Sequence, residues 1–287
     1  MHRRYMKQCL LDTPVDTEAA DDWPEAKNPG ALRMLWQHRE LIYSLVIRDI
    51  RSRYKQSVLG IAWALLQPLA MTAIFTVVMS VIAKVPTGGI PYPIFAYIAM
   101  LPWMFFATSL TSGTECLVGN FNLITKIYFP REVFPIAAVL GKTVDLGLGI
   151  LVLIPLLFAF HVSVTWWALI AIPALIIQVC FLLGITFMLS SANLFYRDIR
   201  HVMPLLTQIW MYLTPIIYGL DMVPKKYLAL YMLNPMVAIM DAYRKVALQG
   251  QPPLWNYLGY SAVFSVVILV FGYWMFKRLE PKFAEMI

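Results

Sequence analysis

Residues 166–192 read WWALIAIPALIIQVCFLLGITFMLSSA, a stretch of apolar and small polar side chains without a single charge. A helix needs about 20 such residues to cross the roughly 30 Å hydrocarbon core of a bilayer, so this stretch is long enough to span a membrane. An open strand would leave unpaired backbone groups in lipid, which predicts that the span is helical. The stretch therefore indicates an all-α integral membrane protein.

Five further apolar stretches have the same character, and together they predict six transmembrane helices. We place the six spans at about 58–83, 94–115, 133–159, 166–192, 203–219 and 257–276. The fifth is short and contains Pro204 and Pro215, so its ends are the hardest to assign. The composition agrees, because 60% of the 287 residues are hydrophobic and only 14% are charged, whereas soluble domains have about 45–50% apolar and 25% charged residues.

The basic residues predict the orientation of the chain. Most of the 23 Lys and Arg lie before residue 58, in the segments 116–132 and 193–202, or after residue 276. Cytoplasmic loops carry an excess of such residues, so both termini are expected in the cytoplasm. The formal net charge of +7 is assigned to topology and lipid headgroups, and no nucleic-acid partner is expected. Residues 1–33 are expected to be a flexible cytoplasmic tail, and residues 277–287 a second one.

Residues 34–57 are predicted to hold an amphipathic helix that lies on the membrane. Within RELIYSLVIRDIRSRYK at 39–55, Ile42, Val46, Ile50 and Tyr54 form one row, and Ser44, Arg48, Arg51 and Lys55 lie on the opposite side. The basic face suits anionic headgroups or an acidic partner surface. An ordinary solvated face leading into the first span explains these residues equally well.

The segment 220–256 is too long and too apolar for a plain connection. A short helix can begin at 221–224, and Asn234-Pro235 is a suitable N-cap and first residue for a second one. Neither helix is long enough to span. We therefore predict a re-entrant helix pair at the outer face, which is allowed where the broken backbone is buried in protein.

No catalytic or metal site can be assembled from the sequence. Cys9, Cys116 and Cys180 are far apart, and no histidine stands at metal-ligand spacing. Two charges within the third span, Lys142 and Asp145, lie three residues apart on one helical face. Charges in hydrocarbon usually face the protein interior, so these two indicate either a structural ion pair or interface, or a direct part in a pathway.

Aromatic side chains in spans 1, 2 and 5 are candidates for the wall of a channel. Lipid-facing packing explains any one of them, but a wall of rings and planar polar groups would suit a carbohydrate better than an ion. On span 1, Trp63 and Gln67 share a face, and Pro68 frees a backbone carbonyl nearby. The candidates are Trp63, Gln67, Phe75, Trp103, Phe106, Trp210, Tyr212 and Tyr218.

Several short motifs occur along the chain in a recognisable order. They are RDIRSRYKQSVLGIAW at 48–63, Gln67-Pro68, FPRE at 129–132, YRD at 196–198, PIIY at 215–218, Asn234-Pro235 and Tyr243-Arg244. As a set they resemble the membrane subunit of ABC-2 type polysaccharide exporters, which include O-antigen, capsule and teichoic-acid permeases. The resemblance covers about residues 37–276.

The resemblance implies roles for particular residues. The amphipathic helix, with Arg48, Arg51 and Lys55, is similar to the family's interface helix. The segment 119–129 is similar to its coupling helix, which would sit in a cleft of the ATPase, and the pair after span 5 is similar to its outer gate. The coupling residues would be Gly119, Asn120, Phe121, Asn122, Leu123, Ile124, Thr125 and Lys126, and the gate residues Asn234, Pro235, Tyr243 and Arg244.

The same resemblance implies the partners and the function. A homodimer would join two copies of a separate ATP-binding-cassette subunit, which binds ATP and Mg, so this chain is expected to be neither an enzyme nor a cofactor-binding protein. The substrate would be a lipid-linked polysaccharide, foremost an O-antigen on polyprenyl diphosphate, exported across the bacterial inner membrane. A capsule or teichoic-acid exporter, or an ABC-2 permease for a small lipid or drug, is the alternative. An integral membrane enzyme would need acids or histidines at a membrane face, and a self-contained channel or secondary transporter would lack the docking loop.

Overall fold

The structure is a computed structural model that describes residues 36–55, 59–126 and 130–284. The predicted tail 1–33, the ends of the predicted interface helix at 34–35 and 56–57, Phe129, and the last three residues lie outside the described residues. The chain divides into two units, Met1–Arg39 and Glu40–Ile287, and the long apolar helices lie in the second. The described residues of this unit form helices and connecting segments and contain no strand.

The described residues form ten α-helices and five short 3-10 or π-helical segments. The first half holds α3 (Arg39–Tyr54), α4 (Ala62–Phe75) with a π-helical extension Thr76–Ile82, α5 (Tyr92–Gly119), α6 (Phe121–Lys126) and α7 (Val133–Ala159). The second half holds a 3-10 segment Trp166–Ile170, α8 (Ala171–Phe195), α9 (Ile199–Tyr212), a 3-10 turn Leu220–Met222 and α10 (Lys225–Tyr231). The chain continues with α11 (Pro235–Arg244), a π-helical turn Lys245–Gln249, α12 (Trp255–Leu279) and a 3-10 segment Glu280–Ala284.

Five helical segments in the described residues are long and apolar enough to cross a membrane. They are Ala62–Ile82, Tyr92–Gly119, Val133–Ala159, Trp166–Phe195 and Trp255–Phe283. The predicted fifth span, 203–219, does not form one long helix, because α9 ends at Tyr212 and the chain then runs without helix to Gly219. Fourteen residues of α-helix rise about 21 Å, which is shorter than the hydrocarbon core.

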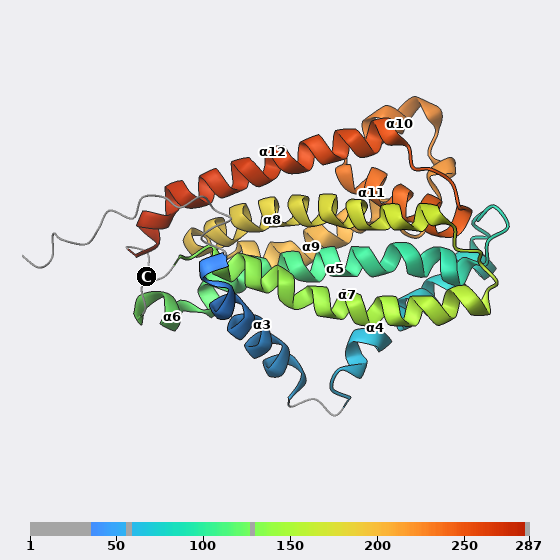
Figure 1. Cartoon of the computed structure of the whole chain (residues 1–287). Helices are drawn as coiled ribbons and strands as arrows, with labels where there is room; N and C mark the ends of the chain where they lie inside the picture. Colours follow the sequence, from blue (N-terminus) through green and yellow to red (C-terminus); the bar gives the residue numbers. More distant parts are fainter. Residues whose placement is uncertain (1–35, 56–58, 127–129, 285–287) are drawn as a thin grey trace, which may run out of the picture. The chain divides into compact units, whose positions relative to one another are not determined.

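α5 lies at the centre of the second unit and packs against α7 and α8, while α12 packs along the other side of α8 (Figure 1). Small residues allow these helices to approach closely. A Cβ built at Gly272 on α12 would lie 2.2 Å from the carbonyl oxygen of Gly184 on α8. A Cβ at Gly149 on α7 would lie 2.0 Å from Leu101 on α5. Helices in membranes commonly use small residues in this way, because close backbone packing replaces the hydrophobic driving force.

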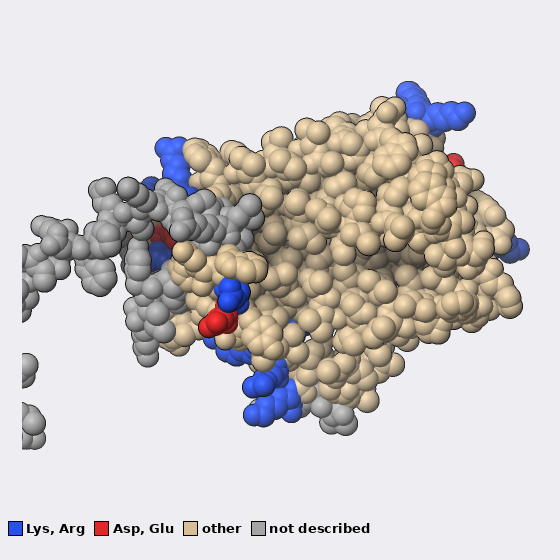
Figure 2. Space-filling view, viewed as in Figure 1, with Lys and Arg blue, Asp and Glu red and all other residues tan. Residues whose placement is uncertain are grey.

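Charged side chains are absent from most of the surface shown in Figure 2. Lys and Arg gather over α3 and at the two ends of the helical bundle, and a broad expanse without charge separates them (Figure 2). Large apolar side chains are exposed on several helices, for example Ile74 on α4, Phe158 on α7 and Val263 on α12. An exposed apolar surface of this extent is typical of a protein whose solvent is lipid.

Candidate functional site

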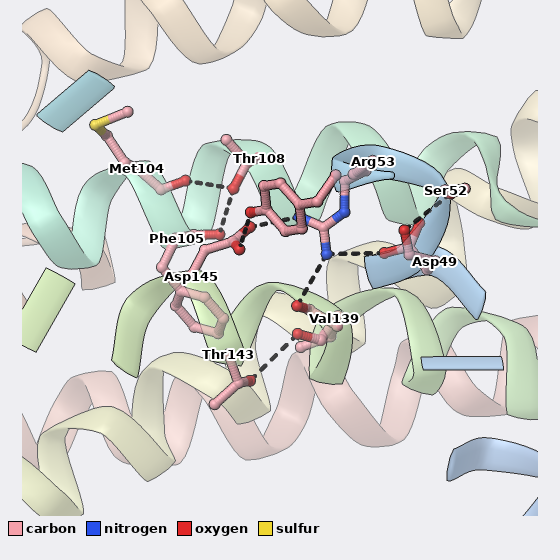
Figure 3. Close-up of polar contacts among 11 residues, drawn as sticks. Asp49, Ser52, Arg53, Met104, Phe105, Thr108, Val139, Thr143 and Asp145 are labelled. Carbon is pink, nitrogen blue, oxygen red and sulfur yellow. Dashed lines mark hydrogen bonds and ion pairs between the residues drawn. The ribbon is translucent and has the colours of Figure 1, made fainter. Parts of the chain in front are cut away.

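A polar cluster joins α3 to the middle of α7 (Figure 3). The Arg53 guanidinium donates from Nη1 to Asp145 Oδ2 at 2.5 Å and from Nη2 to the Gly141 carbonyl oxygen at 3.0 Å. The Tyr54 hydroxyl donates to the second carboxylate oxygen, Asp145 Oδ1, at 2.5 Å. Asp49, one turn earlier on α3, pairs with Arg53 Nη2 at 3.0 Å. Both oxygens of Asp145 are therefore bound by α3.

Local sequence explains why the cluster forms. Asp49 and Arg53 are four residues apart, so they share one face of α3. Gly141 lets that face approach α7, because a Cβ there would lie 2.9 Å from Asp49 Oδ2. Burial, followed by the hydrogen bond to Asp145, raises the pKa of the Tyr54 hydroxyl to about 12. The hydroxyl thus stays protonated at neutral pH and acts as a donor to the carboxylate.

A cavity of about 210 Å³ lies beside this cluster, between α3, α4, α5 and α7. Its polar walls combine charged, amide, hydroxyl and indole groups, while its remaining walls are apolar. The lining residues are Arg53, Tyr54, Trp63, Ala64, Gln67, Pro68, Leu101, Met104, Phe105, Thr108, Lys142, Asp145 and Leu146. We call this cavity the lateral pocket. It brings together four residues that the sequence singled out from separate stretches, namely Trp63, Gln67, Lys142 and Asp145.

The two charges predicted within the third span have different surroundings. Asp145 pairs with Arg53 on α3 and not with its helical neighbour Lys142. Within the described ranges 36–55, 59–126 and 130–284, Lys142 forms no ion pair or hydrogen bond, and it faces the lateral pocket. Of the two predicted roles, the structural ion pair or interface fits Asp145, because its partner Arg53 lies on the neighbouring helix α3. The position of Lys142 at a cavity leaves a part in a pathway open.

The end of α5 contacts α3 near the predicted coupling segment. Arg48 Nη2 donates a hydrogen bond to Asn120 Oδ1, and Asn120 Nδ2 donates to the Cys116 carbonyl oxygen at 2.8 Å. The short helix α6 follows directly after Asn120. Arg51 and Lys55, the other basic residues predicted for the interface, are exposed. Arg48 therefore joins the predicted interface helix to the start of the predicted coupling segment.

Two channel candidates do not fit their surroundings. Trp103 is 3% exposed and Phe106 is 0% exposed. The Phe106 ring is stacked on Phe181 at 6.0 Å and meets the edge of Trp210 at 5.2 Å. We correct the prediction for these two residues, because a ring enclosed by helices of its own chain cannot face a channel. Hydrophobicity alone does not separate a buried ring on α5 from a channel-facing one.

The remaining candidates lie at or near a surface. Trp63 and Tyr212 are about half exposed, Gln67 is exposed, and Phe75, Trp210 and Tyr218 are partly buried. The Tyr218 hydroxyl donates to the Tyr212 carbonyl oxygen at 2.8 Å. The structure therefore brings Trp63 and Gln67 to the lateral pocket, while Tyr212 and Tyr218 lie together at the end of α9.

Asn234 caps α11 and joins it by hydrogen bonds to α9 and to the residues that follow α9. Its Oδ1 accepts from the Met236 backbone N–H at 3.1 Å and from Trp210 Nε1 at 3.1 Å. Its Nδ2 donates to Thr214 Oγ1 at 3.2 Å. The predicted cap and the first helical residue Pro235 are confirmed by these contacts. The same side chain that begins α11 thus also holds the irregular segment after α9.

Arg244 is buried and holds the backbone of that segment. Its Nη1 donates to the carbonyl oxygens of Pro215 and Tyr218 at 2.6 Å each, and Nη2 donates to the carbonyl of Ile216. The guanidinium carbon lies 3.9 Å from the centroid of the Phe95 ring. The carbonyl groups of this non-helical segment therefore receive hydrogen bonds from within the protein, which irregular backbone at membrane depth requires.

Sequence reasoning missed the roles of Arg53, Tyr54 and Gln178. Arg53 and Tyr54 belong to the RDIRSRY motif, and the isolated carboxylate Asp145 in an apolar span was a signal that a cation should lie opposite. Gln178 is fully buried in α8, where it donates to the Pro102 carbonyl oxygen at 2.7 Å and accepts from the Tyr243 hydroxyl at 2.9 Å. A lone amide in the most apolar stretch was the corresponding signal there.

Comparison with known proteins agrees with these features. Residues 40–248 match the family described as ABC-2 type transporter. The chain is 30% identical over 259 residues to the O-antigen export system permease protein RfbA of Myxococcus xanthus, covering 89% of this chain and 98% of that protein. It is 30% identical over 256 residues to an O-antigen export system permease protein RfbA of Klebsiella pneumoniae, covering 86% and 95%. The polysialic acid transport protein KpsM of Escherichia coli is 23% identical over 243 residues, covering 83% and 93%. The resemblance seen in the motifs is confirmed, and the chain belongs to the ABC-2 type transporter family.

Proposed function

We propose that this chain is the permease subunit of an ATP-driven exporter that moves a lipid-linked polysaccharide, an O-antigen on polyprenyl diphosphate, across the bacterial inner membrane. The observation that carries the proposal is the 30% identity to O-antigen export permeases over nearly their whole length. The absence of catalytic constellations in the sequence agrees with a subunit that does not hydrolyse ATP itself. Two copies of a separate ATP-binding-cassette subunit supply the energy.

The proposed topology has six crossings per subunit and both termini in the cytoplasm. α9 together with the irregular segment 213–219 makes the fifth crossing, and α10 and α11 form a re-entrant pair at the outer face. The charge distribution supports an even number of crossings, because an odd number would put Lys277 and Arg278 on the opposite side from the basic face of α3. The carbonyl contacts of Arg244 support irregular backbone at membrane depth.

Energy coupling is proposed to run through α6. This helix, with the residues from Gly119 to Lys126, would dock in the ATPase, and the hydrogen bond between Arg48 and Asn120 would pass its displacement to α3. The cluster around Arg53 and Asp145 would carry the movement on to α7. Arg51 and Lys55, which are exposed, would contact headgroups.

The sugar path is proposed to follow the axis of a homodimer. An amphiphile with a long hydrophilic chain needs a polar or aromatic lining, which two copies of a helical subunit can enclose between them. The lining would draw on Trp63, Gln67, Phe75, Trp210, Tyr212 and Tyr218, and the outer gate on Asn234, Pro235, Tyr243 and Arg244. The exposure of Trp63 and Tyr212 supports this assignment for the first group.

The test uses cells that make the lipid-linked polymer but lack an exporter. The chain is expressed there with the ATP-binding-cassette subunit from its own genome, and polysaccharide at the cell surface is measured. Asn120→Trp is expected to leave membrane insertion and ATP hydrolysis intact and to abolish export, with Lys84→Gln as the control. Export that is unchanged by Asn120→Trp would remove α6 from the mechanism, and no surface polymer with the wild type would overturn the proposed function.

The topology is tested by thiol labelling after Cys9, Cys116 and Cys180 are replaced by serine. Leu230→Cys on α10 suits this purpose, because Leu230 is 68% exposed. An impermeant thiol reagent added outside the inner membrane is expected to label it. Val237 on α11 is fully buried and serves as the unlabelled control position. Labelling of Leu230→Cys from the cytoplasm alone would contradict the six-crossing topology.

A capsule exporter is the second candidate. The similarity to the polysialic acid transport protein of Escherichia coli favours it, at the lower identity of 23%. The same complementation assay separates the two functions when it is run in parallel in a strain that makes a capsule polymer. Export of the capsule polymer alone would select this second function.

A further inference from the structure

Three polar side chains in the lateral pocket have hydrogen-bonding groups that nothing in the described part of the chain satisfies. They are Lys142 on α7 and Trp63 and Gln67 on α4, and no ion pair or hydrogen bond joins their side chains to residues 36–55, 59–126 or 130–284. The ammonium, the indole N–H and the amide N–H groups are all donors. Donors from two helices thus face one cavity without an acceptor of their own.

The cations that line the cavity outnumber its carboxylates. Arg53 and Lys142 are cations that line it, and Asp145 is the one carboxylate among its lining residues. Both oxygens of Asp145 are already bound by Arg53 and Tyr54. Asp49 lies behind Arg53 outside the lining, and its side chain is 40% exposed. A cation within a membrane-spanning helix is costly unless an opposite charge faces it, and none of these carboxylates makes an ion pair with Lys142.

The surroundings of the cavity suit an amphiphile. Pro68, Leu101 and Leu146 give it apolar walls, and the adjoining surface of α4 is apolar and exposed at Met71 and Ile74. A hydrocarbon chain could therefore lie along α4 in the bilayer while a polar group enters between α4 and α7. The indole of Trp63, which lines the cavity and is about half exposed, offers a flat face for a further group attached to that polar group.

We propose that the lateral pocket binds the phosphate group of a membrane amphiphile, with Lys142, Gln67 and Trp63 donating hydrogen bonds to its oxygens and Arg53 contributing charge from one wall. A phosphate fits better than a neutral sugar, because its several oxygens accept from separate donors at once and its charge opposes Lys142. The proposal rests on the proposed function for one of its two sources, the diphosphate of a polyprenyl carrier. An anionic phospholipid headgroup is the other source.

Binding is tested on the purified full-length chain in octaethylene glycol monododecyl ether, a detergent without phosphate or sugar. The probe is radiolabelled farnesyl diphosphate, and its binding is measured by equilibrium dialysis. Saturable binding is expected for the wild type, and Lys142→Gln is expected to weaken it by at least about tenfold, since a charge-assisted hydrogen bond is lost. Lys142→Arg is expected to keep affinity within about threefold because it retains the charge. Lys84→Gln, an exposed lysine remote from the pocket in sequence and fold, is the matched control and is expected to bind as the wild type does.

Competition identifies the source of the phosphate. Dioleoyl phosphatidylglycerol that displaces the probe as well as unlabelled farnesyl diphosphate does would assign the pocket to bulk phospholipid. Displacement that needs at least about tenfold more phosphatidylglycerol would assign it to the diphosphate carrier. If inorganic pyrophosphate competes as well as farnesyl diphosphate does, the proposal that the ligand is an amphiphile would be wrong.

Equal binding by the wild type and Lys142→Gln would overturn the site. If Lys142→Gln does not yield folded protein, Gln67→Leu serves instead and is expected to weaken binding by at least about threefold, through the loss of one hydrogen bond. Unchanged binding in that variant would overturn the assignment as well. Because binding is measured without the ATPase, failure here is distinct from failure of the proposed function, which the export assay measures.

Discussion

Separating Arg53 from Asp145 is expected to release α3 from α7. We consider Arg53→Gln, Asp145→Asn and the double variant. The two side chains are 21% and 23% exposed and lie 2.5 Å apart. Exposed ion pairs contribute about 0.2–1 kcal/mol, and breaking a fully buried pair costs about 3–5 kcal/mol, so a largely buried pair with access to water falls between, at about 2 kcal/mol for each single variant.

The two single losses are not expected to add. Each variant removes the pair between Arg53 and Asp145. Arg53→Gln also gives up the bond to Gly141 and the pair with Asp49, while Asp145→Asn keeps an acceptor for Tyr54. The double variant should therefore show a coupling free energy of about 1–2 kcal/mol between the two positions. A coupling of this size requires direct contact.

Hydrogen exchange of the α3 backbone amides measures the local opening directly. Each single variant is expected to exchange about 30-fold faster over Asp49–Tyr54, because a change of about 1.4 kcal/mol is tenfold in the opening equilibrium. Asp198→Asn removes an exposed carboxylate that forms no ion pair among the described residues, and it is expected to leave exchange of α3 unchanged. Strictly additive effects, with coupling below about 0.5 kcal/mol, would refute the contact.

Three further predictions concern the packing of the helices and the outer segment. Gly272→Val is expected to lower the thermal stability and yield of the purified protein, because the new side chain meets the Gly184 carbonyl, 2.2 Å from its Cβ position; unchanged melting in detergent would contradict the close crossing. Arg244→Gln is expected to raise thiol reactivity of a cysteine placed in the segment 213–219 by about tenfold or more, since about 2 kcal/mol of charge-assisted bonding is lost, and Arg244→Lys is expected to restore only part of it. Trp210→Phe removes the hydrogen bond to Asn234 and is expected to cost about 1 kcal/mol in the unfolding free energy, whereas Trp255→Phe, at an exposed position, should cost nothing measurable.

The membrane-crossing helices could be predicted from the sequence because hydropathy measures what lipid requires. Tyr92–Gly119 and Val133–Ala159 fall close to the predicted 94–115 and 133–159. For the stretch 203–219, hydropathy predicts a span that the structure does not form as one helix. Its apolar length is sufficient for a span, but α9 runs from Ile199 to Tyr212 only. Pro215 and the contacts of Arg244 keep the following backbone irregular, and hydropathy does not predict such contacts.

The candidate site was predictable in part, for a related reason. Periodicity assigns residues to a face of one helix, so Trp63 with Gln67 and Lys142 with Asp145 could be paired from the sequence. It does not say which helices meet. The partner of Asp145 is Arg53, 92 residues earlier in the chain, and only the packing of α3 on α7 at Gly141 reveals it.

In the segment 213–219, Arg244 binds backbone carbonyl oxygens, those of Pro215, Ile216 and Tyr218. Every residue except the last of a chain presents the same peptide carbonyl, so the guanidinium is indifferent to the side-chain chemistry of Ile216, whose carbonyl it binds. Because the Ile216 side chain is fully buried, mutational scanning should find tolerance there for apolar side chains of similar size. At Arg244 itself, lysine is the one exchange expected to keep part of these contacts. Contacts of this kind would let side chains of the segment change while the backbone path between α9 and α10 stays the same.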